Sequence, residues 1–335
     1  MTNSGLKRSF KLGNIVLPSN IFYAPLAGCS DVPFRQMSSQ YQPGLIYCEM
    51  VKMDPLVRHD KKTLELLDFT KDMHPIGGQI CGSKAEYAGP SAKIIEELGF
   101  DVVDLNCGCP VDKVTKDGSG SGLLKNPQLI GDIITNMVAA VKIPVTVKIR
   151  AGWDEQSINA LEVMKIAEEA GAAAICIHGR TREQAYRGPA NWDWVTECKK
   201  QAKSILVIGN GDLFNVDAVE NMFTTTNCDA VLVARGTMGQ PWIAQDIYNY
   251  YDGLPVVERT PMDRLQGLIE HYEKIKAYRD PRKALLDMRR VCCWYIKSAT
   301  GAAAFRGAIN HAESLDSVKE LIHSLMDQCA EKCVS

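Results

Sequence analysis

The chain has 335 residues, 46% hydrophobic and 23% charged, a composition typical of globular proteins that excludes a disordered or fibrous chain. Lysine and arginine total 38 against 40 aspartate and glutamate residues, and the net charge of −2 does not by itself indicate a nucleic-acid partner. Any such partner would have to bind a local basic patch.

Twelve cysteines are too sparse for a disulfide scaffold, and the first residues contain no apolar stretch that could make a signal peptide. We therefore expect a reducing, cytoplasmic location. The longest apolar runs have the length of strands, so no membrane span is predicted. No metal is expected, because Cys107 with Cys109 and Cys292 with Cys293 do not match zinc-ribbon spacing. The sequence leaves the oligomeric state open and is compatible with a monomer.

In chain order, a hairpin is expected first, over residues 10–18 with Gly13 and Asn14 at its turn. Short apolar runs then alternate with amphipathic helical segments. The eight predicted strands are 21–24, 45–48, 76–80, 102–105, 145–149, 174–177, 206–208 and 230–233. The helices predicted after them are 32–39, 61–67, 85–98, 127–141, 158–170, 192–201, 216–224 and 242–250. This pattern favours a (β/α)8 TIM barrel, with the hairpin closing one end, over a doubly wound sheet. No G-x-G-x-x-G follows the first strand, which excludes the dinucleotide-binding signature.

Helix-terminating residues support these boundaries. Gly99 and Gly171 stand where helices end, and Asn126 and Ser157 stand where helices begin. Beyond residues 252–255 the alternation stops, and only helices are predicted, over 262–278, 282–298, 303–312 and 317–333. We therefore expect a barrel over residues 1–254 and a small helical bundle over residues 255–335.

The stretch over residues 102–110 begins as a buried strand and ends in a loop. Val102 and Val103 continue a β-branched pattern, after which Asn, Gly and Pro shape the chain. Cys109 therefore follows the end of a strand, at the edge of a barrel that carries catalytic side chains. Cys107 is expected to be a packing residue, as most free cysteines are. The neighbouring Gly108 and Pro110 favour a functional role for Cys109.

Polar side chains gather at the predicted carboxyl ends of the other strands. Gly211 and Gly236 follow the seventh and eighth strands, where barrels commonly bind phosphate, and Arg235 would add charge-assisted hydrogen bonds. Gln79 and Lys148 could bond a flat heteroaromatic ring during its reduction, which is a flavin-like requirement. Each residue alone has a structural alternative, such as a buried ion pair for Lys148 or a packed core position for His178. The set together favours a cofactor site.

The residues at the strand ends belong to a series of short motifs. The series begins with Ala24-Pro-Leu-Ala-Gly28, Asp31-x-Pro-Phe-Arg35, Glu49-Met50, Gln79-Ile-Cys-Gly-Ser83 and Asp104-Leu-Asn-Cys-Gly-Cys-Pro110. It continues with Gly120-Ser-Gly-Leu-Leu124, Val147-Lys-Ile-Arg-Ala-Gly-Trp153, Ile177-His-Gly-Arg-Thr181, Asn210-Gly-Asp212, Ala234-Arg235, Gln240-Pro-Trp242, Trp294-Tyr295 and Phe305-Arg306. In these motifs, which cover the barrel and reach the helical tail, the sequence resembles the tRNA-dihydrouridine synthase family, closest in pattern to the bacterial B type. Two positions depart from the family pattern, because Ala234 stands where Gly is usual and Ala151 where Thr is usual.

The resemblance implies an oxidoreductase that uses FMN and NADPH to reduce the C5–C6 double bond of uridines in tRNA. It implies that Cys109 protonates C5 while reduced FMN gives hydride to C6. The positions that match the FMN site are Pro25, Leu26, Ala27, Gln79, Lys148, His178, Asn210, Gly211, Asp212, Ala234 and Arg235. Asn106 and Arg180 match positions near the uracil.

The helical tail is locally basic. From Arg279 to Arg306 it holds seven Lys and Arg residues against two Asp, a local charge of +5. Lys283, Arg290 and Lys297 recur every seven residues on one predicted helix and are expected to contact tRNA. A solvated helix face is the alternative interpretation.

Two other functions remain open from the sequence. The same flavin barrel could act on a free pyrimidine, as a dihydroorotate dehydrogenase does, although the basic tail argues against that substrate. The chain could also be a flavin-free RNA-binding scaffold, against which the complete set of strand-end residues argues.

Overall fold

The structure, a computed structural model, describes residues 5–296 and 301–334. The chain divides into two compact units. The first comprises Met1–Asp31 and Gln42–Arg235, and the second comprises Val32–Tyr41 and Gly236–Ser335. The second unit thus begins before residue 255 and includes a segment from early in the chain.

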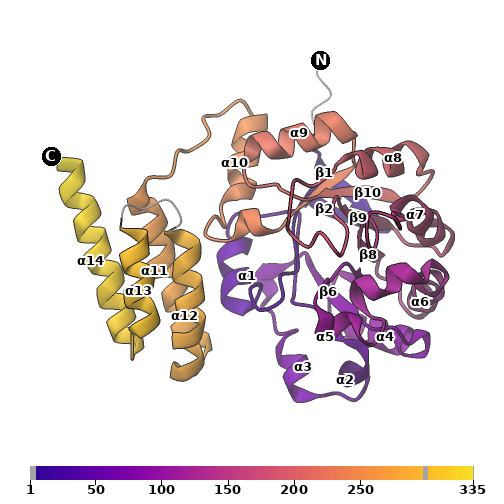
Figure 1. The fold of residues 1–335 in the computed structure, drawn as a ribbon, viewed down its shortest axis with the longest axis horizontal. Helices are drawn as coiled ribbons and strands as arrows, with labels where there is room; N and C mark the ends of the chain where they lie inside the picture. Colours follow the sequence, from indigo (N-terminus) through magenta and orange to yellow (C-terminus); the bar gives the residue numbers. More distant parts are fainter. Residues whose placement is uncertain (1–4, 297–300, 335) are drawn as a thin grey trace. The chain divides into compact units, whose positions relative to one another are not determined.

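Eight parallel strands close into a barrel in the first unit (Figure 1). They are β3 (Ile21–Tyr23), β4 (Leu45–Tyr47), β6 (Ile76–Cys81), β7 (Val102–Cys107), β8 (Val145–Arg150), β9 (Ala174–His178), β10 (Leu206–Asn210) and β11 (Ala230–Val233). β11 pairs with β3, and β4 pairs with both β3 and β6, which completes the ring. A two-residue strand, β5 (Val51–Lys52), pairs beside β6. The predicted TIM barrel is confirmed.

An antiparallel hairpin packs against the amino-terminal half of the barrel interior. Its strands are β1 (Arg8–Leu12) and β2 (Ile15–Ser19). Alternate hairpin residues Phe10, Leu12 and Leu17 are buried in one apolar cluster with interior barrel residues such as Val102 and Ala174. Because Val102 and Ala174 are the first residues of their strands, the hairpin fills this end of the barrel, as expected.

The helices of the first unit surround the barrel (Figure 1). They are α2 (Met53–Val57), α3 (Lys61–Glu65), α4 (Ala88–Glu97), α5 (Asp112–Thr115), α6 (Pro127–Ala140), α7 (Ala160–Glu169), α8 (Asp193–Gln201) and α9 (Val216–Thr226), with short 3-10 turns η1 (Lys71–Met73), η2 (Ala85–Tyr87) and η3 (Gly120–Lys125). A further 3-10 turn, η4 (Arg235–Thr237), begins at the last residue of the first unit. The Asn126 side chain accepts the Leu129 N–H and caps α6. Gly99 and Gly171 adopt φ values of 92° and 90° after α4 and α7, as expected for glycines that end helices. The prediction for Ser157 was wrong, because α7 begins after Asn159 and the Ser157 hydroxyl bonds Asp154 instead.

The second unit is helical. Its helices are α1 (Val32–Ser39), α10 (Ile243–Tyr251), α11 (Pro261–Tyr278), α12 (Pro281–Tyr295), α13 (Ala302–His311) and α14 (Leu315–Val334). An aromatic cluster joins them, with the Phe34 and Trp294 rings 6.2 Å apart and the Trp242 and Tyr295 rings 6.4 Å apart. This cluster explains why α1 groups with the C-terminal helices. Within the described residues, no helix has the length and hydropathy needed to cross a bilayer.

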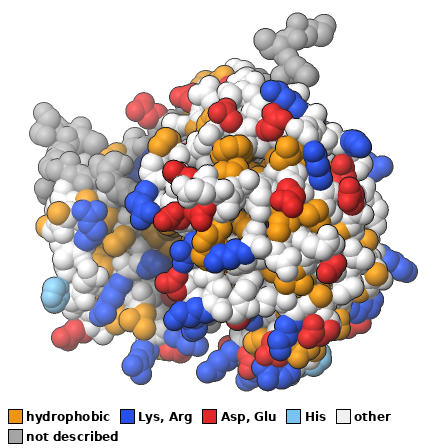
Figure 2. Space-filling view, turned by 45° about the vertical axis from the view of Figure 1, so that its right-hand side comes forward, with side chains coloured by type: hydrophobic (Ala, Val, Ile, Leu, Met, Phe, Trp, Pro, Cys, Tyr) orange, Lys and Arg blue, Asp and Glu red, His pale blue; other side chains and the backbone are white. Residues whose placement is uncertain are grey.

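Basic and acidic side chains are interspersed on the face shown in Figure 2. No large field of one sign covers that face. A partner of strong charge would therefore be recognised by local clusters.

Candidate active site

The barrel brings the expected site residues of the first unit to one edge. Each lies at or just after the carboxyl end of a strand, where barrels carry their active sites. These residues are Pro25, Leu26 and Ala27 after β3, Gln79 in β6, Asn106 in β7 with Cys109 beyond it, Lys148 in β8, His178 in β9 with Arg180 beyond it, Asn210 in β10 with Gly211 and Asp212 beyond it, and Ala234 and Arg235 after β11.

The loop that carries Cys109 is held by its backbone. The Asn106 Oδ1 accepts the backbone N–H groups of Gly108 and Cys109, with N···O distances of 3.3 and 3.0 Å. The Cys109 carbonyl accepts both the N–H and the hydroxyl of Ser121, at 3.1 and 2.9 Å. The Arg150 Nε donates to the Gly108 carbonyl at 2.8 Å. These bonds hold the loop through its backbone and do not involve the sulfur. They therefore position the partly exposed Cys109 without engaging its thiol.

Behind this loop lies a buried chain of polar side chains. The Asn106 Nδ2 donates to the Gln79 Oε1 at 2.9 Å, and the Gln79 Nε2 donates to the Asp104 Oδ2 at 2.7 Å. The other Asp104 oxygen accepts the Thr146 hydroxyl at 2.6 Å. Parallel pairing creates this chain, because Asp104 lies opposite Gln79 on β6 and opposite Thr146 on β8. Burial raises the pKa of Asp104 to about 6, against the opposing effect of its two hydrogen bonds and of Lys148.

Four cationic side chains converge at the same edge of the barrel: Lys148, Arg150, Arg180 and Arg235. Burial lowers the pKa of Lys148, whose Nζ bonds the Asn210 Oδ1 at 3.1 Å. The pKa of His178 lies well below its usual value because the ring is buried and surrounded by Lys148, Arg150, Arg180 and Arg235. His178 is therefore neutral near pH 7, and the surrounding positive charge favours an anionic ligand.

Asp212 joins two of these cations. Its carboxylate accepts the Arg180 Nη2 at 2.7 Å, the Arg235 Nη2 at 3.1 Å and the Ala190 N–H at 2.8 Å. Burial alone would raise the pKa of Asp212, but the bonds from Arg180 and Ala190 outweigh it, so the pKa is lowered. Gly211 has a φ of 122°, and a Cβ there would lie only 2.7 Å from the Ala190 Cβ. Glycine is thus required for the chain to turn at this point.

The turn after β3 is fixed from two sides. The Gly28 N–H donates to the buried Glu49 carboxylate, and the Leu26 N–H donates to the Ser30 hydroxyl at 2.9 Å. Pro25 and Leu26 are half-buried, and Ala27 is exposed. Glu49 therefore positions the turn through its backbone.

The sequence of this chain matches the family model described as dihydrouridine synthase (Dus) over residues 22–332. The chain belongs to the dihydrouridine synthase family. It is 36% identical over 309 residues to tRNA-dihydrouridine synthase B of Pseudomonas syringae pathovar tomato, and the match covers 91% of each chain. It is 35% identical to a probable tRNA-dihydrouridine synthase 1 of Synechocystis, over 94% of this chain and 88% of the relative.

Solved structures confirm the fold. The chain is similar to morphinone reductase with a TM-score of 0.55 and 13% sequence identity, over 79% of this chain and 94% of that one. A histamine dehydrogenase from Rhizobium also has a TM-score of 0.55, with 13% identity, over 79% of this chain and 50% of that one. The dihydrouridine synthase family member described here thus shares the barrel of these proteins.

Several residues at this edge of the synthase barrel were given no role from the sequence. Asp104 and Arg150 occur in the motifs, and each lies two residues from an expected site residue on its strand, so strand periodicity was the available signal. Tyr186 was missed because it lies in a loop with no pattern. Its exposed ring contacts the guanidinium groups of Arg235 and Arg150, at 4.4 and 5.6 Å from the ring centroid.

Arg180, whose position the resemblance places near the uracil, bonds groups of two neighbouring loops. Its side chain is 3% exposed, and it donates to the Gly188 carbonyl through Nε and Nη2, at 3.1 and 2.5 Å, as well as to Asp212. These bonds join the loop after β9 to the loop after β10. The geometry therefore favours a role in positioning Asp212.

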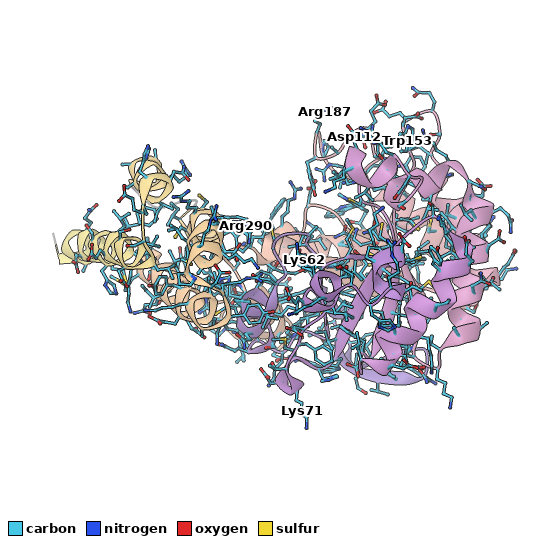
Figure 3. All side chains as sticks on the ribbon, turned by 90° about the horizontal axis from the view of Figure 1, so that it is seen from below. Lys62, Lys71, Asp112, Trp153, Arg187 and Arg290 are labelled. Atoms are coloured by element: carbon cyan, nitrogen blue, oxygen red, sulfur yellow. The ribbon has the colours of Figure 1, made fainter. Side chains whose placement is uncertain are left out.

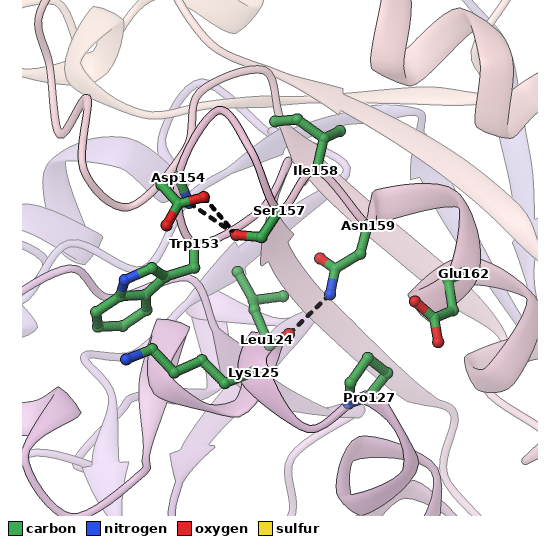
Figure 4. A pocket seen from close by; sticks show the side chains of 9 residues that line it. All are labelled: Leu124, Lys125, Pro127, Trp153, Asp154, Ser157, Ile158, Asn159 and Glu162. Atoms are coloured by element: carbon green, nitrogen blue, oxygen red, sulfur yellow. Dashed lines mark hydrogen bonds between the residues drawn. The ribbon is translucent and has the colours of Figure 1, made fainter.

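A separate hollow of about 660 Å³ lies outside the Cys109 loop of the synthase (Figure 4). It is lined by Leu124, Lys125, Pro127, Trp153, Asp154, Ser157, Ile158, Asn159 and Glu162. Lys125 lies 3.6 Å and the Arg182 guanidinium 4.6 Å from the Trp153 ring centroid. Arg182 also pairs with Asp112, and Figure 3 shows Asp112 and Trp153 on the same edge of the first unit. None of the expected site residues lines this hollow.

Two of the three expected RNA-contacting residues, Lys283 and Arg290, lie on α12 of the second unit. Lys283 is exposed at the first turn of that helix, and Arg290, labelled in Figure 3, is half-exposed. Arg290 bonds Asp287 at 3.0 Å, and Asp287 also bonds Arg279 at 3.2 Å. The acidic residue thus compensates part of the basic charge. Lys297 lies outside the described residues.

Proposed function

We propose that this chain is a tRNA-dihydrouridine synthase that reduces the C5–C6 double bond of uridines in tRNA. The observation that carries the proposal is the thiol of Cys109, held by backbone bonds on a loop at the catalytic edge of the barrel. Membership of the dihydrouridine synthase family supports this substrate. A tRNA substrate also fits a cytoplasmic location.

We propose FMN as the cofactor, which the donor set at the barrel edge fits, and NADPH as its reductant. Bound FMN would supply the hydride that reduces the base. Gln79 and Lys148 offer amide and ammonium groups suited to the flavin ring, and Arg235 with the backbone at Gly211 suits its phosphate. The remaining residues that we assign to the cofactor are Pro25, Leu26, Ala27, His178, Asn210, Asp212 and Ala234. Asp212 would act by holding Arg235, because its carboxylate is already bonded to cations.

Cys109 would donate the proton to C5. A thiol can act as a general acid by giving up its proton. Asn106 holds the backbone of the Cys109 loop and keeps one amide hydrogen for the base. Arg150 would keep the Cys109 loop in place. Its guanidinium bonds the Gly108 carbonyl of this loop and also the Thr181 and Ala185 carbonyls of the loop after β9.

The RNA must present an extruded base, because a stacked base cannot enter the barrel. We propose that the helical domain of residues 255–335 holds the tRNA through phosphate contacts from Lys283 and Arg290, and that Lys297 belongs to the same set. Such contacts carry little sequence information and serve to position the RNA.

The test begins with the absorption spectrum of the purified protein and mass spectrometry of its released cofactor. Oxidised flavin and the mass of FMN are expected. Unmodified tRNA transcript incubated with protein and NADPH should then gain dihydrouridine, measured by nucleoside mass spectrometry. Free uridine and dihydroorotate serve as comparison substrates. A protein without flavin, or one that turns over the free pyrimidines faster than tRNA, would overturn the proposal.

A further inference from the structure

The buried hydrogen-bond chain behind the Cys109 loop has the same donor-to-acceptor order along its length. Thr146 and Gln79 donate to Asp104, Asn106 donates to Gln79, and Asn106 in turn accepts from the backbone of Gly108 and Cys109. All four of these side chains are buried. Each amide therefore has one orientation in which donors meet acceptors along the whole chain.

An amide group has no orientation of its own, so its neighbours must select one. If Gln79 turned over, its carbonyl oxygen would face the Asp104 carboxylate and its NH2 would face the NH2 of Asn106. Both contacts would be repulsive and buried, where an unmatched polar group is strongly unfavourable. An ionised carboxylate can only accept, and a backbone N–H can only donate. These two groups terminate the chain and fix both amides.

We propose that Asp104 is a positioning residue, whose carboxylate fixes the amide of Gln79, through it the amide of Asn106, and so the loop that carries Cys109. This inference rests on the proposed function for its consequence in catalysis. The hydrogen-bond chain itself does not depend on that function.

The two ends of the chain respond differently to substitution. Leu in place of Asp104 removes the acceptor, so the Gln79 amide can turn over and release Asn106. Asn in place of Asp104 can still accept from Gln79 through its oxygen while its NH2 donates to the Thr146 hydroxyl. Thr146→Val is the matched control, because it also removes one hydrogen bond to Asp104 but lies off the path to Cys109.

The first measurement is the rate at which iodoacetamide alkylates Cys109, followed by peptide mass spectrometry with the partly exposed Cys293 as internal reference. Asp104→Leu should change the Cys109 rate by about threefold or more, because the loop loses its anchor, whereas Thr146→Val and Asp104→Asn should stay near the parent. The Cys293 rate should not change. Equal Cys109 rates in Asp104→Leu and the parent would overturn the proposal, as would an equal change in Thr146→Val. Neither flavin turnover nor tRNA enters this measurement, so it separates the proposal from the proposed function.

The second measurement compares half-reactions. Tenfold or greater loss of tRNA reduction is expected in Asp104→Leu, on the order of what a misplaced catalytic group costs, with a smaller loss in flavin reduction by NADPH. Equal losses in both half-reactions would show a general structural defect and would reject the positioning role.

The third measurement is the pH profile of tRNA reduction, which remains decisive if Asp104→Leu does not fold. Protonation of Asp104 turns one oxygen into a donor and leaves the other to accept from Gln79, which is the arrangement that Asn provides at every pH. As the pH falls through about 6, the rate of the parent should therefore approach that of Asp104→Asn and then change in parallel with it. The ionisable groups that face Asp104 are Lys148 on β8, Cys176 on β9, Tyr47 on β4 and Cys107 on β7, and both proteins retain them. A parent that loses activity as the pH falls through about 6 while Asp104→Asn does not would show that the charge of Asp104, and not its acceptor oxygen, is what matters, and would contradict the proposal.

Discussion

At the scale of single residues, the proposed function assigns proton donation to Cys109 and cofactor binding to other residues of the barrel edge. The Cys109 loop is held by Asn106, Ser121 and Arg150 through backbone atoms, and those bonds survive truncation of the side chain. Cys109→Ala should therefore retain flavin and its reduction by NADPH, while dihydrouridine formation falls by about 10²-fold or more, the range for loss of a general acid. Single-turnover reduction of tRNA is the measurement.

The control for that variant is Cys107→Ala. Cys107 is fully buried at the end of β7, where burial raises the pKa of its thiol well above the usual value. Its removal should leave a small cavity and nearly parental turnover. Full tRNA reduction by Cys109→Ala in a single turnover would exclude the thiol as the proton donor.

Arg235 is the second residue with a separable role. Its guanidinium bonds Asp212 and lies near the Tyr186 and Phe214 rings, which hold it at the edge of the barrel. Arg235→Ala should weaken FMN binding by about 1.5–3 kcal/mol, the usual range for a charge-assisted hydrogen bond, and leave the barrel folded. Equilibrium titration of the apoprotein with FMN measures this loss.

Arg182→Ala provides the matched control for Arg235. Arg182 likewise combines an acidic partner, Asp112, with an aromatic ring, that of Trp153, but it lies away from the expected phosphate position. Unchanged FMN affinity in Arg235→Ala, or an equal loss in Arg182→Ala, would place the phosphate elsewhere.

At the scale of elements, helix α12 illustrates how ion pairs modify a basic face. Lys283 is exposed, whereas Arg290 shares Asp287 with Arg279. Because a paired charge releases fewer counterions on binding a phosphate, Lys283→Ala should flatten the log–log salt dependence of tRNA binding by about one unit and Arg290→Ala by less. Adding Lys297→Ala to both should bring the total toward about 2–3 units.

The control on the same unit is Lys319→Ala. Lys319 pairs with Glu273 at 2.7 Å, so its charge is already compensated. Flavin content should stay constant in all of these variants. If the Lys283, Arg290 and Lys297 triple variant binds tRNA with the parental affinity and salt slope, α12 does not contact the phosphates.

The elements also show what could be predicted from the sequence. All eight barrel strands were found because burial on both faces makes them rich in apolar residues, although β6, β7 and β8 also carry polar residues. The helices α2 and α5 were missed because five and four residues are too few to show a helical period. Ser157 was assigned wrongly as a cap since the loop before α7 uses it to bond Asp154. The grouping of α1 with the C-terminal helices rests on the Phe34 contacts, which are distant in sequence.

The site was predictable to the level of residue types at strand ends. The orientation of Gln79 and Asn106 was not, because it depends on which residues face each other across β6, β7 and β8. The pairing of Arg180 with Gly188 and Asp212 likewise joins separate loops. Such contacts follow from register and loop geometry, which sequence patterns do not specify.

At the scale of the whole molecule, pH should affect the two units in opposite directions. Burial lowers the pKa of His271 in the second unit to about 3, so between about pH 6.5 and 3 the unfolded chain binds a proton that the folded one does not. Stability of that unit should fall as the pH drops below 6.5. Asp104 has a raised pKa, and between about pH 6 and 4 its protonation instead favours the folded first unit.

Hydrogen exchange of α11 and β7 measures the two effects separately. Lowering the pH from 7 to 5 should reduce the opening free energy at α11, by up to about 2 kcal/mol, the linkage of one strongly shifted group over this range. The His271→Gln variant should lose most of that dependence. A pH dependence in α11 that is the same in both proteins would assign it to other groups.

The hairpin formed by β1 and β2 closes the amino-terminal end of the barrel, so reactants have access from the carboxyl ends of the strands. Phe10, Leu12 and Leu17 fill the opposite end, so everything that reacts must enter and leave past the strand ends that carry Cys109. A nicotinamide and an extruded uracil would compete for this end of the barrel. They would therefore bind one after the other and not together. Initial rates plotted in double-reciprocal form against NADPH, at several tRNA concentrations, should then give parallel lines. Intersecting lines would mean that both substrates are admitted together. Because both substrates would bind at the same end, tRNA in excess should also inhibit its own reduction by competing with NADPH for binding.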